Sequence, residues 1–293
     1  ATGYNDIGVA GAAFGAKILP VRALGRCGGY LSDLIDGIVW AAGGTVTGVS
    51  ANTTPARVIN MSVGGTGTCT TTLQAAIDKA RSLGAVVVVA AGNESADVST
   101  SVPANCANVV AVAATGPTGA RASYSNYGTG VSLAAPGGDW AGGILSTLND
   151  GAQSPGNFTY VSYIGTSMAT PHVSAAAAMM WAVNPNMNPD QVASLLKRSV
   201  KSFAGDCSGC GAGALNALGA VQAASAAATS LLDVTEVESN NTLGTAQSIA
   251  STPARISGSI SSTSDQDFYK VSIAPGGKLT ALLVAGASVN YDL

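Results

Sequence analysis

Charged side chains are scarce in this sequence. Only 10% of the 293 residues are Asp, Glu, Lys or Arg, whereas about 25% is usual for a soluble domain. The formal net charge is −3 and no run of Lys or Arg occurs, which argues against a nucleic-acid partner. Long apolar runs are also missing: the longest candidate, residues 173–183, is shorter than the ~20 residues that cross a membrane. Its many alanines are typical of a buried core helix instead. We therefore expect an exported protein with a neutral polar surface and no membrane segment.

Histidine and cysteine are few: there is one His and there are five Cys. An odd number of cysteines in an exported protein indicates that one of them pairs outside the chain. Cys207 and Cys210 lie close together in a Gly/Ser turn and can bridge locally. Of the other three, Cys69 with Cys106 is the favoured pair, which leaves Cys27 single. A zinc site at Cys207 and Cys210 is the alternative, but it needs a second pair of ligands.

Short β-rich runs alternate with amphipathic stretches through most of the chain. The expected strands are residues 17–24, 58–62, 85–91, 109–114 and 131–135, and the expected helices are residues 32–42, 71–83, 167–183 and 189–200. Ser32 is the expected N-cap of the first helix. The run AVVVVAA at 85–91 is typical of a strand buried on both faces of a parallel sheet. This alternation predicts an α/β fold with a doubly wound, mostly parallel sheet, in which function lies at the carboxyl ends of the strands.

The pattern changes beyond residue 223. Helical periodicity stops, and short alternating runs follow at residues 255–260, 268–273 and 278–284, separated by Gly, Pro and Ser turns. We therefore expect an α/β domain over residues 1–223, a linker over 224–235, and a small, incomplete all-β sandwich over 236–293.

Three short segments carry candidate chemistry. The octapeptide GTSMATPH at 165–172 places Ser167 at the start of a buried helix, where unpaired amides and the helix dipole favour negative charge. On spacing alone, a simple helix cap explains Ser167 equally well. The string AAGN at 90–93 places Asn93 after the buried strand, where its amide is able to stabilise an oxyanion. Alone, an ordinary Asn turn is the simpler interpretation. The string NMSVGG at 60–65 ends another strand with small residues suited to pairing with an extended peptide.

Together these strings resemble the subtilisin-like serine peptidases, and the octapeptide is highly specific to that family. The resemblance covers roughly residues 1–222, and PANC at 103–106 and RASYSNYG at 121–128 are closest to exported bacterial members. It implies that Ser167 is the nucleophile and that Asn93 is the oxyanion-hole side chain. It also implies pocket walls for the substrate residue before the scissile bond, with small neutral surfaces that suit medium or large apolar side chains. The implied wall residues are Ser62, Val63, Gly64, Gly65, Ala90, Ala91 and Gly92, with Gly28, Gly29 and Leu31 at the opposite edge.

The resemblance also implies partners and an ion. Protein or peptide substrates outside the cell are expected, with a propeptide in the parent protein and a monomeric state. Calcium is the expected structural ion, and Asn5, Ile7 and Val9 match a calcium loop of the family.

Residues 236–293 resemble the pre-peptidase C-terminal domains of exported bacterial peptidases, through ESNNTLGTAQ and SDQDFYKV. This module contains a set of oxygen ligands suited to a hard cation, namely Glu236, Glu238, Asn240, Asp265 and Asp267. The alternative is a solvated surface with turn-forming Asp and Asn.

Two members of the family's catalytic triad are missing. The triad runs Asp, His, Ser along the chain, and the Asp and His motifs should precede Thr2–Gly11. The sequence starts at Ala1 without an initiator Met or signal peptide, so we expect a fragment of a longer protein. His172, the single histidine, follows Ser167 by five residues, about 140° around a helix, and should face away from it. Without a general base the hydroxyl is a poor nucleophile, so we expect the chain alone to have no useful peptidase activity.

Two other functions fit parts of the pattern. A sedolisin-type acid peptidase also uses a Gly-Thr-Ser nucleophile, but Asn93 and the Met168–His172 continuation argue against it. A degenerate peptidase that only binds peptides or matrix is compatible with the missing Asp and His. The intact Ser167 and Asn93 disfavour that second alternative. An Asp-Thr-Gly and a His-Gly-Thr-His motif encoded upstream would favour the enzyme.

Overall fold

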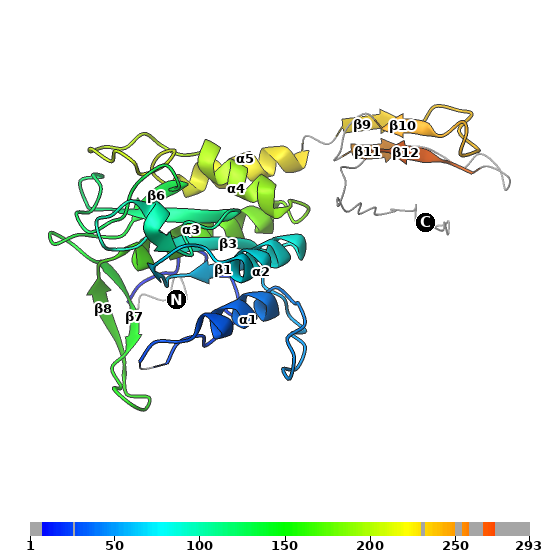
Figure 1. Ribbon diagram of the computed structural model, residues 1–293. Helices are drawn as coiled ribbons and strands as arrows, with labels where there is room; N and C mark the ends of the chain where they lie inside the picture. The colour runs from blue at the N-terminus through cyan, green and yellow to red at the C-terminus, as the bar shows by residue number, and fades with distance from the viewer. Residues whose placement is uncertain (1–7, 26, 230–231, 250–253, 258–265, 273–293) are drawn as a thin grey trace. The chain divides into compact units, whose positions relative to one another are not determined.

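A computed structural model describes residues 8–25, 27–229, 232–249, 254–257 and 266–272. The chain divides into two compact units, Ala1–Ala228 and Thr229–Leu293 (Figure 1). Within the span expected as a linker, 224–235, the described residues belong to the end of helix α5 (Ala217–Thr229) and to strand β9 (Leu232–Thr235).

The first unit is built on a parallel sheet of four strands. In spatial order these are β1 (Val58–Met61), β3 (Val86–Ala90), β5 (Val109–Thr115) and β6 (Leu133–Pro136). Every residue of β3 is buried, because β3 lies inside the sheet and both its faces are covered. The expected positions of these four strands and their parallel pairing are confirmed.

Helices cover both faces of this sheet (Figure 1). They are α1 (Leu31–Ala41), α2 (Thr71–Ser82), α3 (Thr166–Val183), α4 (Pro189–Arg198) and α5. Alternate residues of β3 face opposite sides: Val87 and Val89 pack with α1 and α2, whereas Val86 and Val88 pack with α3, α4 and α5. The sheet is therefore doubly wound, as predicted.

The expected strand at 17–24 is wrong. This segment has no strand assignment, and Ile18 is 85% exposed. The nearest β pairing among the described residues is an isolated bridge between Gly25 and Gly28, just after this segment. A strand requires a hydrogen-bonded neighbour, and β1 pairs with β3 alone among the described strands. The expected cap is also wrong: α1 begins at Leu31, and its N-cap Tyr30 makes no side-chain capping bond.

Several elements were not expected from the sequence. A hairpin of β7 (Ile144–Asn149) and β8 (Phe158–Tyr163) precedes α3. A short antiparallel pair joins β2 (Gly65–Thr66) to β4 (Ser101–Val102), and a 3-10 turn, η1, spans Val98–Thr100. Of these elements, β2 and β4 contribute residues to the groove described below, whereas Val98 of η1 is buried in the core.

The disulfides follow the sequence-based expectation. Cys69 is bonded to Cys106 and Cys207 to Cys210, and Cys27 is a free, exposed thiol. The bonded sulfurs of Cys207 and Cys210 exclude the alternative zinc site, because zinc requires free thiolates.

The second unit contains short strands in its described residues. Strand β9 pairs in parallel with β11 (Ala254–Ser257), and β10 (Gln247–Ile249) pairs in parallel with β12 (Tyr269–Val271). The expected strands at 255–260 and 268–273 overlap β11 and β12, whereas residues 278–284 lie outside the described residues. Among the described helices, none combines the length and the apolarity that spanning a membrane requires.

Candidate active site

Ser167 lies in the first turn of α3 and is locked to the end of β1. Its hydroxyl donates to the backbone carbonyl of Ser62 at 3.3 Å, and the Ser62 hydroxyl donates to the Ser167 carbonyl at 2.9 Å. Pro171 explains why that carbonyl is available. It stands four residues further along the helix and lacks the N–H that would normally bond to it. A proline inside the helix thus frees an acceptor that joins α3 to the loop after β1.

Asn93 follows β3 and presents its amide to the same place. Its Oδ1 accepts two hydrogen bonds from Thr166, one from the backbone N–H and one from the hydroxyl, both at 2.9 Å. The neighbouring Gly92 has φ +109°, a conformation that favours glycine and turns the chain sharply after the strand. With its oxygen bound to Thr166, the amide keeps its Nδ2 donor directed to the other side.

Gly165 has no side chain, and the position that a Cβ would occupy there lies near two nitrogen atoms of the site. A Cβ placed on Gly165 would lie 3.6 Å from the Ser167 backbone nitrogen and 3.7 Å from Asn93 Nδ2. The Ser167 amide belongs to the first turn of α3, where backbone N–H groups have no intrahelical acceptor, and the Asn93 nitrogen is the donor end of its amide. Two N–H groups near one point are the kind of donor pair that an oxyanion hole requires.

A groove of about 440 Å³ contains these groups. Most sequence-predicted residues line it: Ser62, Val63, Gly64, Gly65, Ala90, Ala91, Gly92, Asn93, Gly29, Leu31 and Ser167. Gly28 does not line it, because the groove edge is formed by the residues after it, including Tyr30. Apolar side chains form much of the remaining wall, namely Leu24, Leu34, Leu73 and Val102.

Four residues important to this geometry were missed from the sequence. Thr166 orients Asn93, and its place in GTSMATPH was a usable signal. Glu94 and Ser101 line the groove, and Asn126 hydrogen-bonds both of them from outside it. No spacing connects residues 94, 101 and 126, since only folding brings these three loops together.

Comparison with known proteins agrees with this geometry. A profile of the subtilase family (Peptidase_S8) matches residues 1–219. The chain belongs to the subtilase family. The sequence-based resemblance to subtilisin-like peptidases is confirmed at that level.

Relatives of this subtilase chain include named proteases. It is 58% identical over 214 residues to an extracellular protease of Xanthomonas campestris, covering 72% of this chain and 36% of the relative. It is 38% identical to subtilisin Savinase of Lederbergia lenta, covering 72% and 70% of the two chains. A solved protease from Pseudoalteromonas arctica superimposes with a TM-score of 0.74 at 49% identity, covering 75% of this chain and 66% of that one. The chain thus spans little more than a third of the length of the Xanthomonas relative.

The single histidine of the subtilase chain contacts its own helix. The Nδ1 atom of His172 lies 2.8 Å from the backbone oxygen of Met168, within the same helix. That contact holds the ring against the preceding turn of its own helix, and a structural role for His172 stays a prediction.

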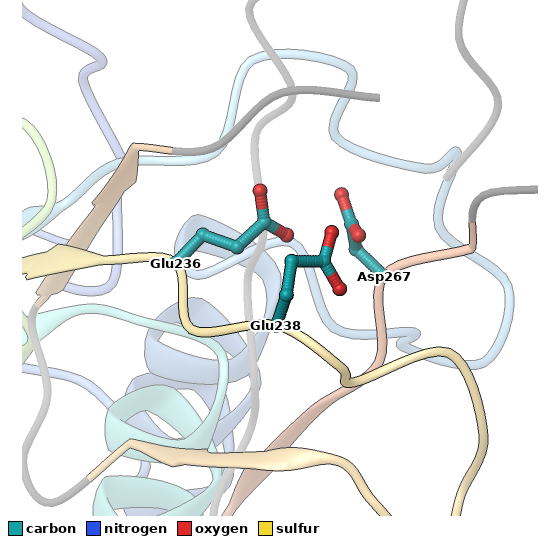
Figure 2. A group of neighbouring side chains, drawn as sticks. All are labelled: Glu236, Glu238 and Asp267. Carbon is teal, nitrogen blue, oxygen red and sulfur yellow. The ribbon is translucent and has the colours of Figure 1, made fainter. Parts of the chain in front are cut away.

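The expected calcium loop is only partly visible. Asn5 and Ile7 lie outside the described residues, and Val9 is half-buried. The second unit of this subtilase instead shows a defined acidic cluster of Glu236, Glu238 and Asp267 (Figure 2). One carboxylate oxygen from each of the three lies within 4.8 Å of the others.

Two further side chains surround Glu236. The amide Nδ2 of Asn240 donates to its carboxylate at 3.2 Å, and the Tyr269 hydroxyl donates to it at 2.9 Å. Burial, followed by this bond to Glu236, raises the pKa of Tyr269. Asn240 is 0% exposed, and its Oδ1 is buried with no hydrogen-bond partner among the described residues. Asp265, the fifth residue of the expected set, lies outside the described residues.

Proposed function

We propose that this chain carries the nucleophile and oxyanion hole of a secreted serine endopeptidase. The observation that carries the proposal is the shared groove, which Ser167 and Asn93 both line, with the Ser167 backbone nitrogen and Asn93 Nδ2 each within 3.7 Å of the Cβ position of Gly165. The Ser167 hydroxyl attacks the substrate carbonyl and gives its proton to a general base, the peptide C–N bond then breaks, and the amine leaves with a proton. Water hydrolyses the resulting acyl-enzyme ester, which releases the carboxylic acid and restores the hydroxyl. The two amides hold the developing negative charge on the carbonyl oxygen.

The groove suits an extended peptide with an apolar side chain before the scissile bond. Its walls combine small residues at 62–65 and 90–92 with leucine and valine side chains, and they leave room for a medium or large apolar group. The substrates are proteins or peptides outside the cell.

The general base must come from outside these 293 residues. The only histidine is bonded to Met168, and no other imidazole exists in the chain. Removing the triad partners of a serine nucleophile costs on the order of 10⁶ in turnover. We therefore expect the 293-residue chain alone to hydrolyse peptides at a negligible rate.

A serine-directed phosphonate tests this function. The full-length gene product should be labelled, and Ser167→Ala should abolish both labelling and peptide hydrolysis, whereas the exposed-serine control Ser123→Ala should retain both. Persistent labelling of Ser167→Ala would assign the nucleophile elsewhere. A full-length protein that binds peptides without hydrolysing them would support the non-catalytic alternative.

We infer that calcium is the structural ion, bound at the acidic cluster of the second unit. The donors there are carboxylates and an amide, which suits a hard cation that prefers six to eight oxygens. Rotating the Asn240 amide by half a turn would exchange its Nδ2 and Oδ1 atoms. The oxygen that now has no partner would then face Glu236 and be available as a ligand to a bound cation. The loop at Asn5, Ile7 and Val9 is a second proposed calcium site.

Thermal unfolding with and without calcium tests the cluster. Calcium should raise the Tm of the second unit, and Glu238→Gln should remove that increase. Asp36→Asn removes the same charge from an exposed position on α1 and should leave the increase intact. An unchanged calcium response in Glu238→Gln would overturn the site.

A further inference from the structure

Asn126 is a buried asparagine that does not line the groove. It lies between β5 and β6 and is 0% exposed. Burial of a side-chain amide is unfavourable unless its polar atoms are hydrogen-bonded. The partners of Asn126 are concentrated in one place, the segment 91–96 that carries Asn93.

Both ends of the Asn126 amide bind that segment. Its Oδ1 accepts from the backbone N–H of Glu94 at 3.0 Å and of Ala96 at 2.9 Å. Its Nδ2 lies 3.0 Å from the Ala91 carbonyl and 2.8 Å from the Glu94 carboxylate. The backbone N–H of Asn126 donates to the Gly92 carbonyl at 3.0 Å. One residue thus binds the chain on both sides of Asn93.

The same side chain reaches two further points of the site. The Glu94 carboxylate that it binds also accepts the backbone N–H of Asn93, at 2.8 Å. Its Nδ2 lies 2.7 Å from the hydroxyl of Ser101, which lines the groove. A Cβ on Gly92 would overlap the Asn126 amide, so the segment passes as close to Asn126 as glycine permits.

We propose that Asn126 is a positioning residue that holds the Asn93 amide in the oxyanion hole. The inference rests on the proposed peptidase function. An oxyanion donor acts because it is held in place before the charge develops, within about 0.5 Å of the productive position. Thr166 fixes the rotation of the Asn93 side chain, and Asn126 fixes the backbone from which that side chain projects.

A double-mutant cycle in the full-length enzyme tests this assignment. Asn126→Ala should lower kcat about 10- to 100-fold with little change in KM. In an Asn93→Ala background the same substitution should cause no further fall, because the donor that Asn126 positions is already gone. If the alanine variant does not fold, Asn126→Asp takes its place. Asp keeps the side-chain volume and can still accept the N–H groups of Glu94 and Ala96. It replaces the Nδ2 donor with a carboxylate oxygen, which repels the Glu94 carboxylate.

Asn184→Ala is the matched control. Asn184 is also buried, and its amide donates to the Ala224 carbonyl at 3.1 Å, at the end of α3. Its loss should lower the Tm and leave kcat unchanged. The inference would be overturned if the fold-reductions in kcat caused by Asn126→Ala and Asn93→Ala multiply in the double variant. A folded Asn126→Ala with unchanged kcat would overturn it as well. If Asn93→Ala itself leaves kcat unchanged, the proposed function fails instead.

Hydrogen exchange of the 293-residue chain supplies a readout that needs no activity. The Glu94 and Ala96 amides should lose protection in Asn126→Ala and keep it in Asn184→Ala. Unchanged protection of both amides in Asn126→Ala would show that other contacts hold the loop, and would overturn the inference.

Discussion

Thr166 donates twice to a single atom of Asn93, through its backbone N–H and through its hydroxyl, each at 2.9 Å from Oδ1. These bonds determine which end of the Asn93 amide is available to a substrate. A carbonyl oxygen in the groove needs a donor, and only the nitrogen end supplies one. The start of α3 therefore positions both Ser167, the proposed nucleophile, and Asn93, the side chain proposed to stabilise the oxyanion.

Replacing Asn93 should impair the chemical step more than substrate binding. Loss of one oxyanion-hole donor lowers kcat by about 10²- to 10³-fold, so we expect Asn93→Leu in the full-length enzyme to show this fall with nearly unchanged KM. Asn188→Ala is the control, because Asn188 caps α4 with its side chain. It should reduce stability by about 1 kcal/mol without affecting kcat. A rise in KM at constant kcat for Asn93→Leu would contradict the assigned role.

Adding a side chain at Gly92 should lower the stability of the protein. Its φ is +109°, and an added Cβ would overlap the buried Asn126 amide. We expect Gly92→Ala to cost the conformational penalty of about 1–2 kcal/mol and a further ~1–3 kcal/mol of steric overlap. Gly48→Ala separates the two effects, since Gly48 has φ +76° but nothing within 4 Å of its Cβ position. If urea unfolding gives equal losses of unfolding free energy for both variants, the Asn126 side chain must move aside at no cost.

The two disulfides should differ in their contribution to stability. The Cys69–Cys106 bond closes a loop with a sequence separation of 37, whereas Cys207–Cys210 has a separation of 3. Loop-closure entropy predicts about 4 kcal/mol for the long loop and about 2 kcal/mol for the short one. Paired Cys→Ala variants, compared by denaturant unfolding, should therefore rank in that order. The reverse order would mean that local packing outweighs chain entropy here.

Lowering the pH should reduce the contribution of Asp97 to the free energy of unfolding. Its carboxylate accepts the Ser99 N–H at 2.9 Å at the start of the η1 turn, and this hydrogen bond lowers the pKa of Asp97 in the folded protein. A lowered folded pKa means that the stabilisation is present above the unfolded value of about 3.9. It is lost as the pH falls through the folded pKa. Wild type and Asp97→Ala should therefore differ in unfolding free energy at pH 7 and converge in strong acid. A constant difference across that range would exclude this linkage.

Local pattern was sufficient for the four-stranded sheet and for α1 to α4, whereas α5 was not expected. The roles of Ser167 and Asn93 came from the resemblance to a family, not from spacing alone. The run at 85–91 has one stable environment, inside a sheet, and the octapeptide marks the start of α3 together with Ser167. Asn93 lies just after the buried strand β3, but this position alone favoured an ordinary Asn turn. Such features depend on periodicity and on neighbours in the chain, which the order of residues states directly.

The remaining features depend on segments that meet only after folding. Residues 17–24 have β-strand composition but no strand partner among the described residues, so composition alone misled. Asn126 binds a loop more than 30 residues away, and Tyr269 reaches Glu236 across the second unit. Hydrogen bonds between distant loops depend on distance and direction in space, and no period in the chain encodes them. The sequence thus predicts which groups are the candidates for the chemistry, whereas packing of the loops determines how each group is held.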